Sequence, residues 1–289
     1  MRICRFNGDR IGLVRDPIVF DITELCEQAG VAPPLRPVGD PLVIRLPGIL
    51  KSIAALDTNE LEQFKIAEVR LECPVRFPTK LVGAGSNYAR HREEMTVGKP
   101  TSHKGYDLYS DGVFLKANSS LAGPADGISI QFPNRDTHHE VELVAVIGAP
   151  AKNVAPQDAL KYVAAYTVGL DITMRGKEER SLRKSFDTYS VLGPWLITAD
   201  ELGDPGNVEL TLSVNGVGRQ KDSTKNMVVD TATIIAFASR FYTLLPGDLI
   251  WTGTPSGVGA IRHGDHIKAG ADCIGLMDVD VRLASDQIY

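Results

Sequence analysis

The chain of 289 residues has few cysteines, no long apolar run and no cluster of basic residues. Its four cysteines are scattered and form no C-x-x-C pair, which excludes a cysteine-based zinc site and a disulfide framework and favours core thiols in a reducing compartment. No apolar run approaches the ~18 residues that a membrane-spanning helix needs, and Met1–Phe6 does not resemble a signal peptide. We therefore predict a cytoplasmic protein with no membrane partner.

Charge and composition narrow the possibilities further. The net charge is −5, and no basic stretch is long enough to follow a phosphate backbone, so nucleic acid is not an expected partner. Apolar residues make up 43% of the chain and charged residues 23%, which are ordinary values for a globular protein and exclude intrinsic disorder. The length allows one large domain or two, and the sequence has no internal repeat.

The proline-rich stretch 73–78 divides the sequence into a short first part and a longer second part. The first part has three short β-type segments separated by Asn-Gly and Asp-Pro turns, and a short helix is expected after Thr23. The prolines between positions 33 and 47 argue against one long helix in the segment that follows. We predict a small N-terminal α+β domain of residues 1–75 and a second domain of residues 76–289.

The most informative stretch is His138–Gly148, an apolar and β-branched segment that predicts a buried strand yet carries two glutamates. Side chains alternate across a strand, so Glu140 and Glu142 point to the same face, roughly 7 Å apart at about 3.3 Å per residue. Like charges held this close repel each other, and burial removes their hydration, so a cation between them would stabilise both. Two ordinary glutamates on a solvated strand face are the alternative.

A second apolar strand, around Tyr166–Thr173, carries another carboxylate at Asp171. Three carboxylates on two strands match an oxygen-ligand site for Mg²⁺ or Mn²⁺, completed by water and substrate. No group of histidines and cysteines in the sequence competes with it as a zinc site. Because aspartate is also common as a turn residue at a strand end, the third acid alone is weak evidence.

A charged segment after the predicted strand at 81–85 contains His91 and Glu94, three residues apart. On a helical turn the two side chains share a face, which fits a histidine oriented by a carboxylate and acting as general base. A surface ion pair is the competing interpretation, and the spacing alone favours it. The polar stretch 96–112 that follows could be a lid over the site or an inert loop.

Three other stretches of the second part are less decisive. Residues 174–185 are densely charged, and most of these charges are predicted to lie on a solvated helix face. The glycine-rich stretch 252–259 is neither G-x-G-x-x-G nor a P-loop, and its glycines are expected to let backbone amides approach a small anion. Thr231–Thr243 has the pattern of an amphipathic helix with Phe241 on its inward face.

Taken in order, the motifs resemble the fumarylacetoacetate hydrolase superfamily over about residues 80–283. The order and spacing of many motifs together carry this resemblance: Asn87-Tyr88 before His91 and Glu94, His139–Leu143, Asp171, Lys184–Thr188, Leu192–Trp195, Val214–Gly216, Pro246–Asp248 and Thr252–Gly259. The resemblance implies a mixed, β-rich α+β fold with a β-sandwich roll as catalytic domain. It also implies a Mg²⁺ or Mn²⁺ cofactor, a 2-oxo acid as small-molecule substrate and usually a homodimer.

The resemblance assigns roles to individual residues. The metal ligands that it implies are Glu140, Glu142 and Asp171. His91 and Glu94 become the dyad that activates water, and Lys184 becomes the cation beside a developing enolate. The residues expected to contact substrate are Arg175, Gln220 and Thr254, with Lys116 and Tyr88 as further candidates.

The implied reaction is hydrolysis of a C–C bond in an acylpyruvate-like 2,4-diketo acid, in which pyruvate leaves through a metal-stabilised enolate. Oxaloacetate decarboxylation, or hydration or isomerisation of a 2-oxo-enoate, passes through the same enolate and is the alternative within the superfamily. A 2-oxo acid binding protein is the alternative from another class, and the His91–Glu94 pair argues against it. Met174-Arg175-Gly176 departs from the common Ala-Arg-Asp of the superfamily, which leaves the tail of the substrate open.

Overall fold

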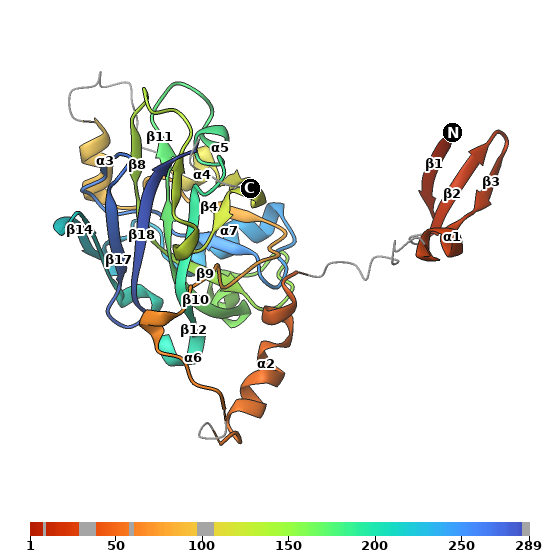
Figure 1. Cartoon of the computed structure of the whole chain (residues 1–289), viewed down its shortest axis with the longest axis horizontal. Coiled ribbons are helices and arrows are strands. Elements are labelled where there is room, and N and C mark those ends of the chain that lie inside the picture. The colour runs from red at the N-terminus through yellow and green to blue at the C-terminus, as the bar shows by residue number, and fades with distance from the viewer. Residues whose placement is uncertain (8–9, 29–38, 58–60, 97–106, 285–289) are drawn as a thin grey trace. The chain divides into compact units, whose positions relative to one another are not determined.

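The computed structural model describes residues 1–7, 10–28, 39–57, 61–96 and 107–284, and it divides the chain into two compact units, Met1–Val38 and Gly39–Tyr289 (Figure 1). The division lies well before the predicted boundary at residue 75. The reason is Asp40, whose Oδ2 accepts hydrogen bonds from the backbone N–H groups of Arg76 and Phe77 and whose own N–H donates to Pro246 O. These bonds tie the start of the second unit to its distant parts.

The first unit has the predicted three strands and short helix. The strands form an antiparallel sheet in the order β1-β2-β3, with β1 at Arg2–Phe6, β2 at Arg10–Arg15 and β3 at Ile18–Asp21. Helix α1 follows at Thr23–Gln28. The hydroxyl of Thr23 accepts a hydrogen bond from the Ile11 N–H (2.9 Å), which joins the start of the helix to the sheet.

A 13-residue helix, α2 (Pro41–Ile53), opens the second unit. The Asp40 side chain caps it by accepting from the N–H groups of Leu42 and Val43, and Pro41 occupies its first turn, where a missing N–H costs nothing. Pro47 lies inside the helix. Pro47 therefore does not break α2, while the prediction of no single long helix also covers residues 33–38, which lie outside the described residues.

The described residues of the second unit form three sheets, which confirms the predicted mixed, β-rich α+β fold. The largest has seven strands in the order β5-β4-β15-β9-β10-β12-β6. Its strands in chain order are β4 (Leu81–Gly83), β5 (Phe114–Lys116), β6 (Leu121–Ala122), β9 (Val141–Ile147), β10 (Val163–Asp171), β12 (Ser190–Thr198) and β15 (Leu249–Trp251).

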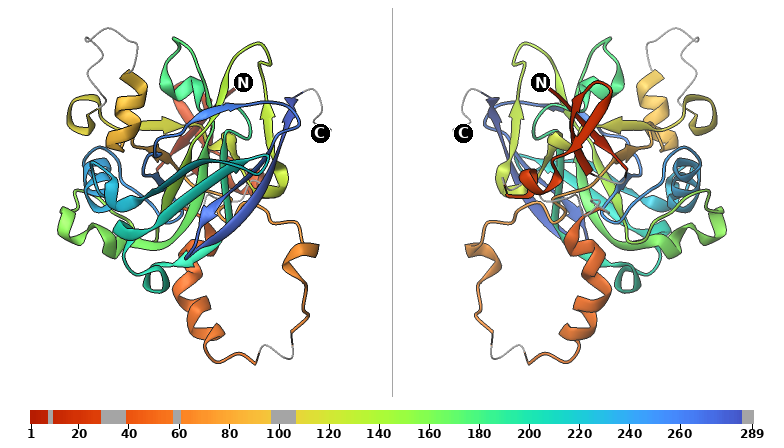
Figure 2. Two further views of the ribbon diagram at one scale, coloured as in Figure 1. Left: turned by 90° about the vertical axis from the view of Figure 1, so that its left-hand side faces the viewer. Right: turned by 90° about the vertical axis from the view of Figure 1, so that its right-hand side faces the viewer.

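A five-stranded sheet in the order β14-β13-β17-β18-β7 packs against it, with β13 on β9 and β18 on β12 (Figure 2). Its strands are β7 (Ile128–Ile130), β13 (Glu209–Val214), β14 (Val217–Ser223), β17 (His266–Ala271) and β18 (Gly275–Leu283). The predicted hairpin at Asn215-Gly216 joins β13 to β14. A small sheet in the order β11-β8-β16 completes the unit, with strands β8 (Thr137–His139), β11 (Thr173–Met174) and β16 (Gly259–Ile261).

Short helices connect these strands. They are α3 (Ala89–Thr96), α4 (Leu108–Asp111), α5 (Arg180–Arg183), α6 (Ala199–Leu202) and α7 (Thr231–Phe241), with 3₁₀ turns η2 (Ile66–Glu68), η3 (Asn118–Ser120), η4 (Pro124–Asp126), η5 (Pro156–Tyr162), η6 (Pro205–Asn207) and η7 (Thr224–Asn226). Among the described residues, none of these helices is long and apolar enough to cross a membrane. Most of the predicted lid at 96–112 lies outside the described residues.

The core lies between the packed sheets and under α7. Every residue of β9 is buried, and Ile234 and Ile235 of α7 join the same apolar cluster. Phe241, at the end of α7, is 60% exposed, so the prediction that it faces inward is wrong. The helix ends there, which takes its last side chain out of the buried row. β9 and β10 are thus held in the middle of the unit, where they carry the candidate site.

Candidate active site and metal centre

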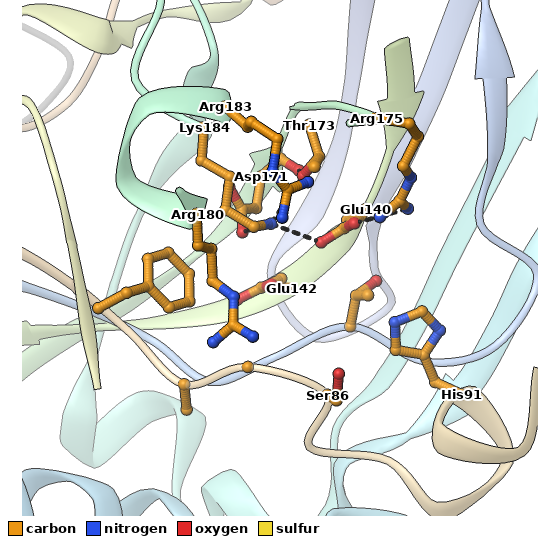
Figure 3. Close-up of a pocket in the computed structure, with 14 residues that line it drawn as sticks. Ser86, His91, Glu140, Glu142, Asp171, Thr173, Arg175, Arg180, Arg183 and Lys184 are labelled. Atoms are coloured by element: carbon orange, nitrogen blue, oxygen red, sulfur yellow. Dashed lines mark hydrogen bonds and ion pairs between the residues drawn. The ribbon is translucent and has the colours of Figure 1, made fainter. Parts of the chain in front are cut away.

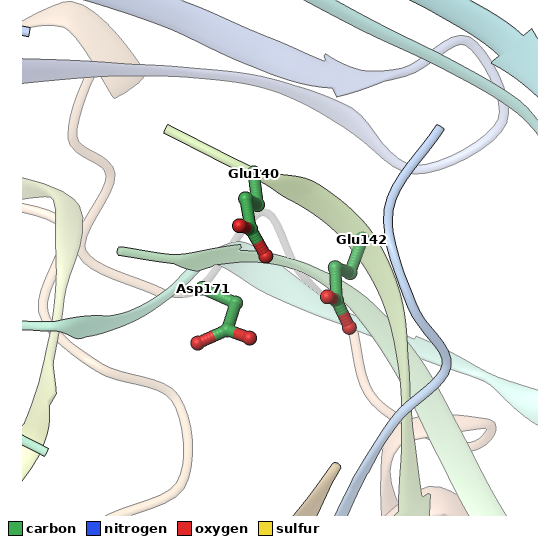
Figure 4. Close-up of side chains that lie close together, drawn as sticks. All are labelled: Glu140, Glu142 and Asp171. Atoms are coloured by element: carbon green, nitrogen blue, oxygen red, sulfur yellow. The ribbon is translucent and has the colours of Figure 1, made fainter. Parts of the chain in front are cut away.

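The three predicted metal ligands come together at the meeting point of β9 and β10. Glu142 lies in β9, Glu140 directly before it, and Asp171 at the end of β10. The strands are antiparallel, and the Asp171 N–H donates to Glu140 O (2.9 Å), so the register sets the carboxylates side by side. One ligand atom from each lies within 4.8 Å of the others, and all three residues are buried (Figure 4).

The electrostatics of this cluster suit a divalent cation. Burial and the neighbouring Asp171 raise the pKa of Glu142 well above its usual range, because three carboxylates cannot easily share one buried space. Burial also acts on Glu140, but Lys184 and Arg175 outweigh it and hold the pKa of that carboxyl below its usual range. Oxygen-only ligands match Mg²⁺ or Mn²⁺. These residues could therefore hold either ion.

Two lysines fix the orientation of Asp171. Lys184 Nζ donates to Asp171 Oδ2, to Glu140 Oε2 (2.9 Å) and to Thr173 Oγ1 (2.7 Å). The positively charged side chain of Lys184 therefore lies at the site, as the sequence predicted. Lys116 Nζ donates to Asp171 Oδ1 (2.5 Å) and to Tyr189 O (2.8 Å) and lies over the Trp251 ring. Lys116 is fully buried and does not line the cavity, so the structure places it as a support of Asp171 instead of at the predicted substrate contact.

The predicted dyad forms on α3. His91 Nδ1 lies 3.1 Å from Glu94 Oε2, and His91 is buried in the wall of the same cavity as the carboxylates (Figure 3). Since a carboxylate only accepts, this contact puts the ring hydrogen on Nδ1 and leaves Nε2 able to take a proton. The Gly257 N–H donates to both Glu94 oxygens (3.2 Å each). A histidine oriented by a carboxylate therefore lies in the same cavity as the candidate metal ligands.

The glycine-rich loop after β15 does bring amides to anions, but the anions are the protein's own carboxylates. The Gly253 N–H donates to Glu142 Oε2 (2.8 Å), and the Gly257 N–H donates to the Glu94 carboxylate. Gly253 has φ +95°, and a Cβ there would lie 2.6 Å from the Asn87 Cβ. The loop thus positions a candidate metal ligand and half of the dyad, instead of a bound anion.

Gln220 and Thr254 form one buried network. Gln220 Oε1 accepts from the Val141 N–H (3.1 Å) and lies 3.0 Å from His139 Nδ1, while Nε2 donates to Thr254 Oγ1 (2.9 Å). Thr254 lines the cavity and donates to Val141 O (2.8 Å). Gln220 does not line the cavity; it supports the strand between the two glutamates, which differs from its predicted role as a substrate contact.

Tyr88 is also placed away from the cavity wall. Its side chain is buried, its hydroxyl has no hydrogen-bond partner in the described part of the chain, and burial raises its pKa. The backbone at Tyr88 instead bridges Met227. The structure therefore gives no support to direct substrate contact by this side chain.

The charged stretch after β11 lines the cavity, so the prediction of a solvated helix face is wrong for its arginines. Arg175 donates to Glu140 Oε1 (2.9 Å), and Arg180 and Arg183 extend from α5 into the same cavity (Figure 3). Sequence reasoning identified Arg175 through the resemblance but missed the other two. The spacing of Arg180 and Arg183, three residues apart and adjacent to Lys184, was the available signal.

The fold and the site together are those of a metal-dependent enzyme, in which three candidate oxygen ligands lie in one cavity with a histidine–carboxylate pair. The chain belongs to the fumarylacetoacetate hydrolase family: residues 80–282 match the family model described as "Fumarylacetoacetate (FAA) hydrolase C-terminal". This confirms the resemblance inferred from the motifs.

Relatives differ in the activity that their names give. The chain is 42% identical to a maleylpyruvate hydrolase from Aquipseudomonas alcaligenes, over 98% of this chain and 99% of that protein. A solved maleylpyruvate hydrolase from Sphingobium sp. SYK-6, in complex with manganese(II) and pyruvate, is 37% identical with a TM-score of 0.73 and covers 98% of this chain and 99% of its own. The mitochondrial oxaloacetate tautomerase Fahd2a of Rattus norvegicus is 35% identical over 73% of this chain and 69% of its own length.

Proposed function

We propose that this protein hydrolyses a C–C bond in an acylpyruvate-like 2,4-diketo acid and releases pyruvate. The observation that carries the proposal is one cavity that holds both a buried set of three carboxylates and a histidine oriented as a base. The similarity to maleylpyruvate hydrolases over the whole chain supports it, as does the manganese and pyruvate in one of their structures.

The dyad would supply the nucleophile. His91 Nε2 accepts a proton from water as the water oxygen attacks the carbonyl carbon distal to the carboxylate, and Glu94 stabilises the charged ring through Nδ1. The new C–O bond forms as the C–C bond breaks, and the electron pair leaves as the enolate of pyruvate. Return of a proton to that enolate carbon completes the products, pyruvate and a carboxylic acid.

The metal ion, held by Glu140, Glu142 and Asp171, would supply Lewis acidity toward the oxygens of the 2-oxo acid. Lys184 adds a fixed positive charge where the enolate develops. Burial opposes its charge, but the adjacent Asp171 and Glu140 outweigh it and keep the pKa of Lys184 above its usual value. A buried charge in place before the reaction stabilises the leaving enolate without reorganisation.

Pyruvate release from a panel of acylpyruvates, with Mn²⁺, Mg²⁺ or EDTA, tests the proposal. We expect metal-dependent release by the wild type, a loss of roughly 100- to 10,000-fold in His91→Ala, and full activity in His266→Ala, an exposed histidine away from the cavity. Cleavage that survives both EDTA and His91→Ala would overturn the proposal.

A tautomerase or decarboxylase of oxaloacetate is the second candidate, favoured by the similarity to the rat oxaloacetate tautomerase. Decarboxylation needs no attacking water, so His91→Ala should spare it while abolishing hydrolysis, whereas tautomerisation is separated from hydrolysis by its product. Enol–keto interconversion or CO₂ release from oxaloacetate, with no pyruvate from any acylpyruvate, would decide for this candidate.

We also propose that the protein is a homodimer in the cytoplasm. The homodimer rests on the family resemblance, and the cytoplasmic location rests on the scattered cysteines of the sequence. Light scattering after size-exclusion chromatography checks the dimer, and fractionation of the source cells checks the location.

A further inference from the structure

The proposed reaction develops negative charge at two oxygens. In the proposed mechanism, Lys184 and the metal ion stabilise the enolate oxygen of the pyruvate part. The second charge forms on the oxygen of the distal carbonyl, which becomes an alkoxide when water adds to its carbon. An alkoxide in a buried site needs a hydrogen-bond donor that is already aimed at it. The site therefore requires one more donor than the metal ligands and Lys184 supply.

Most donors in the cavity wall already have a partner within the protein. Lys184 and Arg175 donate to the three carboxylates, and Arg183 and Thr254 donate to backbone carbonyls. The hydroxyl of Ser86 differs from these groups. Ser86 lines the cavity and is half-buried, and within the described part of the chain its hydroxyl has no hydrogen-bond partner.

Ser86 and His91 belong to one stretch of chain, which runs from the end of β4 into α3. Both side chains point into the cavity from this stretch (Figure 3). His91 is proposed to take the proton of the attacking water, so the carbon under attack lies next to this wall. A donor on the same wall can therefore reach the oxygen bound to that carbon.

The backbone of Ser86 is in the left-handed region, with φ +42°. This conformation is costly for a residue with a side chain, and it persists only where the surroundings impose it. Here Arg92 Nε donates to Ser86 O (2.7 Å), and Asn87 Nδ2 donates to Val229 O (2.7 Å) and Thr252 O (2.8 Å). Glycine would adopt this φ without strain, so a serine at this position points to a use for its hydroxyl.

The turn that carries Ser86 is also fixed against the glycine-rich loop. A Cβ on Gly253 would lie 2.6 Å from the Asn87 Cβ, so the two segments are in close contact. The Gly253 N–H in turn donates to Glu142 Oε2 (2.8 Å). The Ser86 hydroxyl is thus held in a defined place relative to the candidate metal ligand Glu142. A donor that is in place before the reaction stabilises the developing charge without reorganisation.

We infer that Ser86 is a catalytic residue whose hydroxyl donates a hydrogen bond to the oxygen of the attacked carbonyl. The inference rests on the proposed function. As the water oxygen bonds to the carbonyl carbon and His91 takes the proton, an electron pair of the C=O bond moves onto the carbonyl oxygen, where the Ser86 hydroxyl binds it. When this pair forms the C=O bond again, the C–C bond breaks and its electrons leave with the pyruvate enolate. Ser86 keeps its proton throughout.

Hydrolysis of an acylpyruvate by Ser86→Ala and Ser86→Gly, both with Mn²⁺ bound, tests the inference. Each change removes the donor, and we expect kcat to fall roughly 100-fold. KM should stay close to wild type, because the hydrogen bond becomes strong only as the charge develops. Ser86→Cys keeps a weak donor and should lose less. A kcat of Ser86→Ala equal to that of the wild type would overturn the inference.

Ser86→Gly separates the hydroxyl from the fold. Because glycine adopts a positive φ without strain, the midpoint of urea denaturation should stay close to or above that of the wild type while kcat falls. Asn153→Gly is the matched control, since Asn153 has φ +51°, is exposed and does not line the cavity. Its kcat should equal that of the wild type. A loss of stability in Ser86→Gly that accounts for the loss of activity would overturn the inference.

Binding of unreactive ligands separates this inference from the proposed function. Calorimetry with Mn²⁺ present compares pyruvate with a phosphinate analogue, in which a tetrahedral anion replaces the distal carbonyl. We expect Ser86→Ala to bind the analogue roughly 10- to 100-fold more weakly than the wild type and to bind pyruvate equally well, because pyruvate lacks that group. Equal binding of the analogue by both proteins would overturn the inference while hydrolysis stands. Weaker binding of the analogue by the variant, with no turnover of any acylpyruvate by the wild type, would contradict the proposed function alone.

Discussion

The floor and the rim of the cavity are built in different ways. The floor carboxylates are Glu140, Glu142 and Asp171, which lie in β9 and β10 or directly before β9, at the centre of the largest sheet. Lysines hold Asp171 from two sides. Three half-buried arginines form the rim. Arg180 and Arg183 lie on α5, a helix of four residues, and Arg175 lies in the connecting segment before it. The floor is thus fixed by the core, whereas the rim depends on a short helix and a connecting segment. The two meet at Arg175, which donates to Glu140.

The difference separates two kinds of chemistry. A floor fixed by strand pairing suits the part of the reaction that every 2-oxo acid shares, namely polarisation of the 2-oxo group and stabilisation of the enolate. A rim on a short helix suits the part that varies, which is the substrate's tail. Substitutions on the floor should therefore affect all substrates, and substitutions on the rim should affect the choice among them.

The largest effect is expected from Asp171→Asn. The change removes a candidate metal ligand and leaves Lys116 and Lys184 buried beside a neutral side chain. We expect roughly a 1000-fold loss of kcat/KM on every substrate and a loss of about 3–5 kcal/mol in the free energy of unfolding, measured by pyruvate release and urea denaturation. Asp158→Asn, in an exposed pair with Lys161, is the control. Unchanged Mn²⁺ affinity in Asp171→Asn would contradict the assignment of the floor.

A smaller effect is expected from Glu94→Gln. The amide can still contact His91 but no longer stabilises the charged ring, and it changes the acceptor of the Gly257 N–H. We expect a loss of roughly 10- to 100-fold in kcat, with Mn²⁺ affinity unchanged because Glu94 is no metal ligand. Equal kcat in wild type and Glu94→Gln would remove Glu94 from the dyad.

Gln220→Leu tests the support beneath the floor. The change removes the Gln220 acceptor of the Val141 N–H and the Gln220 donor to Pro255 O, both buried, so we expect a loss of about 1–3 kcal/mol in the free energy of unfolding. KM should stay close to wild type, because Gln220 lies outside the cavity wall. A large rise in KM with unchanged stability would instead restore the role of substrate contact that the sequence suggested.

The smallest effect concerns protons. The raised pKa of Glu142 means that the metal-free protein keeps a proton there at pH values above the usual range of a glutamate, and a bound cation would displace it. Mn²⁺ affinity should therefore rise with pH through that window. In the metal-free protein, the same group binds more protons folded than unfolded, so its contribution to the free energy of unfolding falls as pH rises.

Calorimetry of Mn²⁺ binding in buffers with different ionisation enthalpies counts the released protons. Glu142→Gln should bind Mn²⁺ weakly and release no proton from this position. If the wild type binds Mn²⁺ and releases no proton at every pH tested below neutrality, the account of the crowded carboxylates is contradicted.

Sequence reasoning was strongest where a residue type conflicts with its surroundings. Glu140 and Glu142 stand out in an apolar, β-branched run, and strand alternation predicts that they point to one face. In the structure both point into the same three-carboxylate cluster. The spacing of His91 and Glu94 predicted their contact on one helical turn, but that spacing alone favoured a surface ion pair, and the role of a dyad came from the family resemblance. Strand and hairpin positions followed from local turn residues.

Long-range contacts explain what the sequence did not indicate. The boundary between units depends on Asp40 bonding to Arg76, Phe77 and Pro246, which no local pattern predicts. The support roles of Lys116 and Gln220 depend on partners 55 and 79 positions away. Arg180 and Arg183 were assigned to a solvated face, because a run of charges has the same sequence pattern whether it faces water or a cavity lined with carboxylates.

The most direct test of the central claim follows the oxygen of water. Cleavage of an acylpyruvate in H₂¹⁸O with Mn²⁺, analysed by mass spectrometry, should place one ¹⁸O in the carboxylate of the released acid, because water attacks the distal carbonyl. An acid fragment without label, or tautomerised substrate with no acid fragment, would contradict hydrolysis at this site.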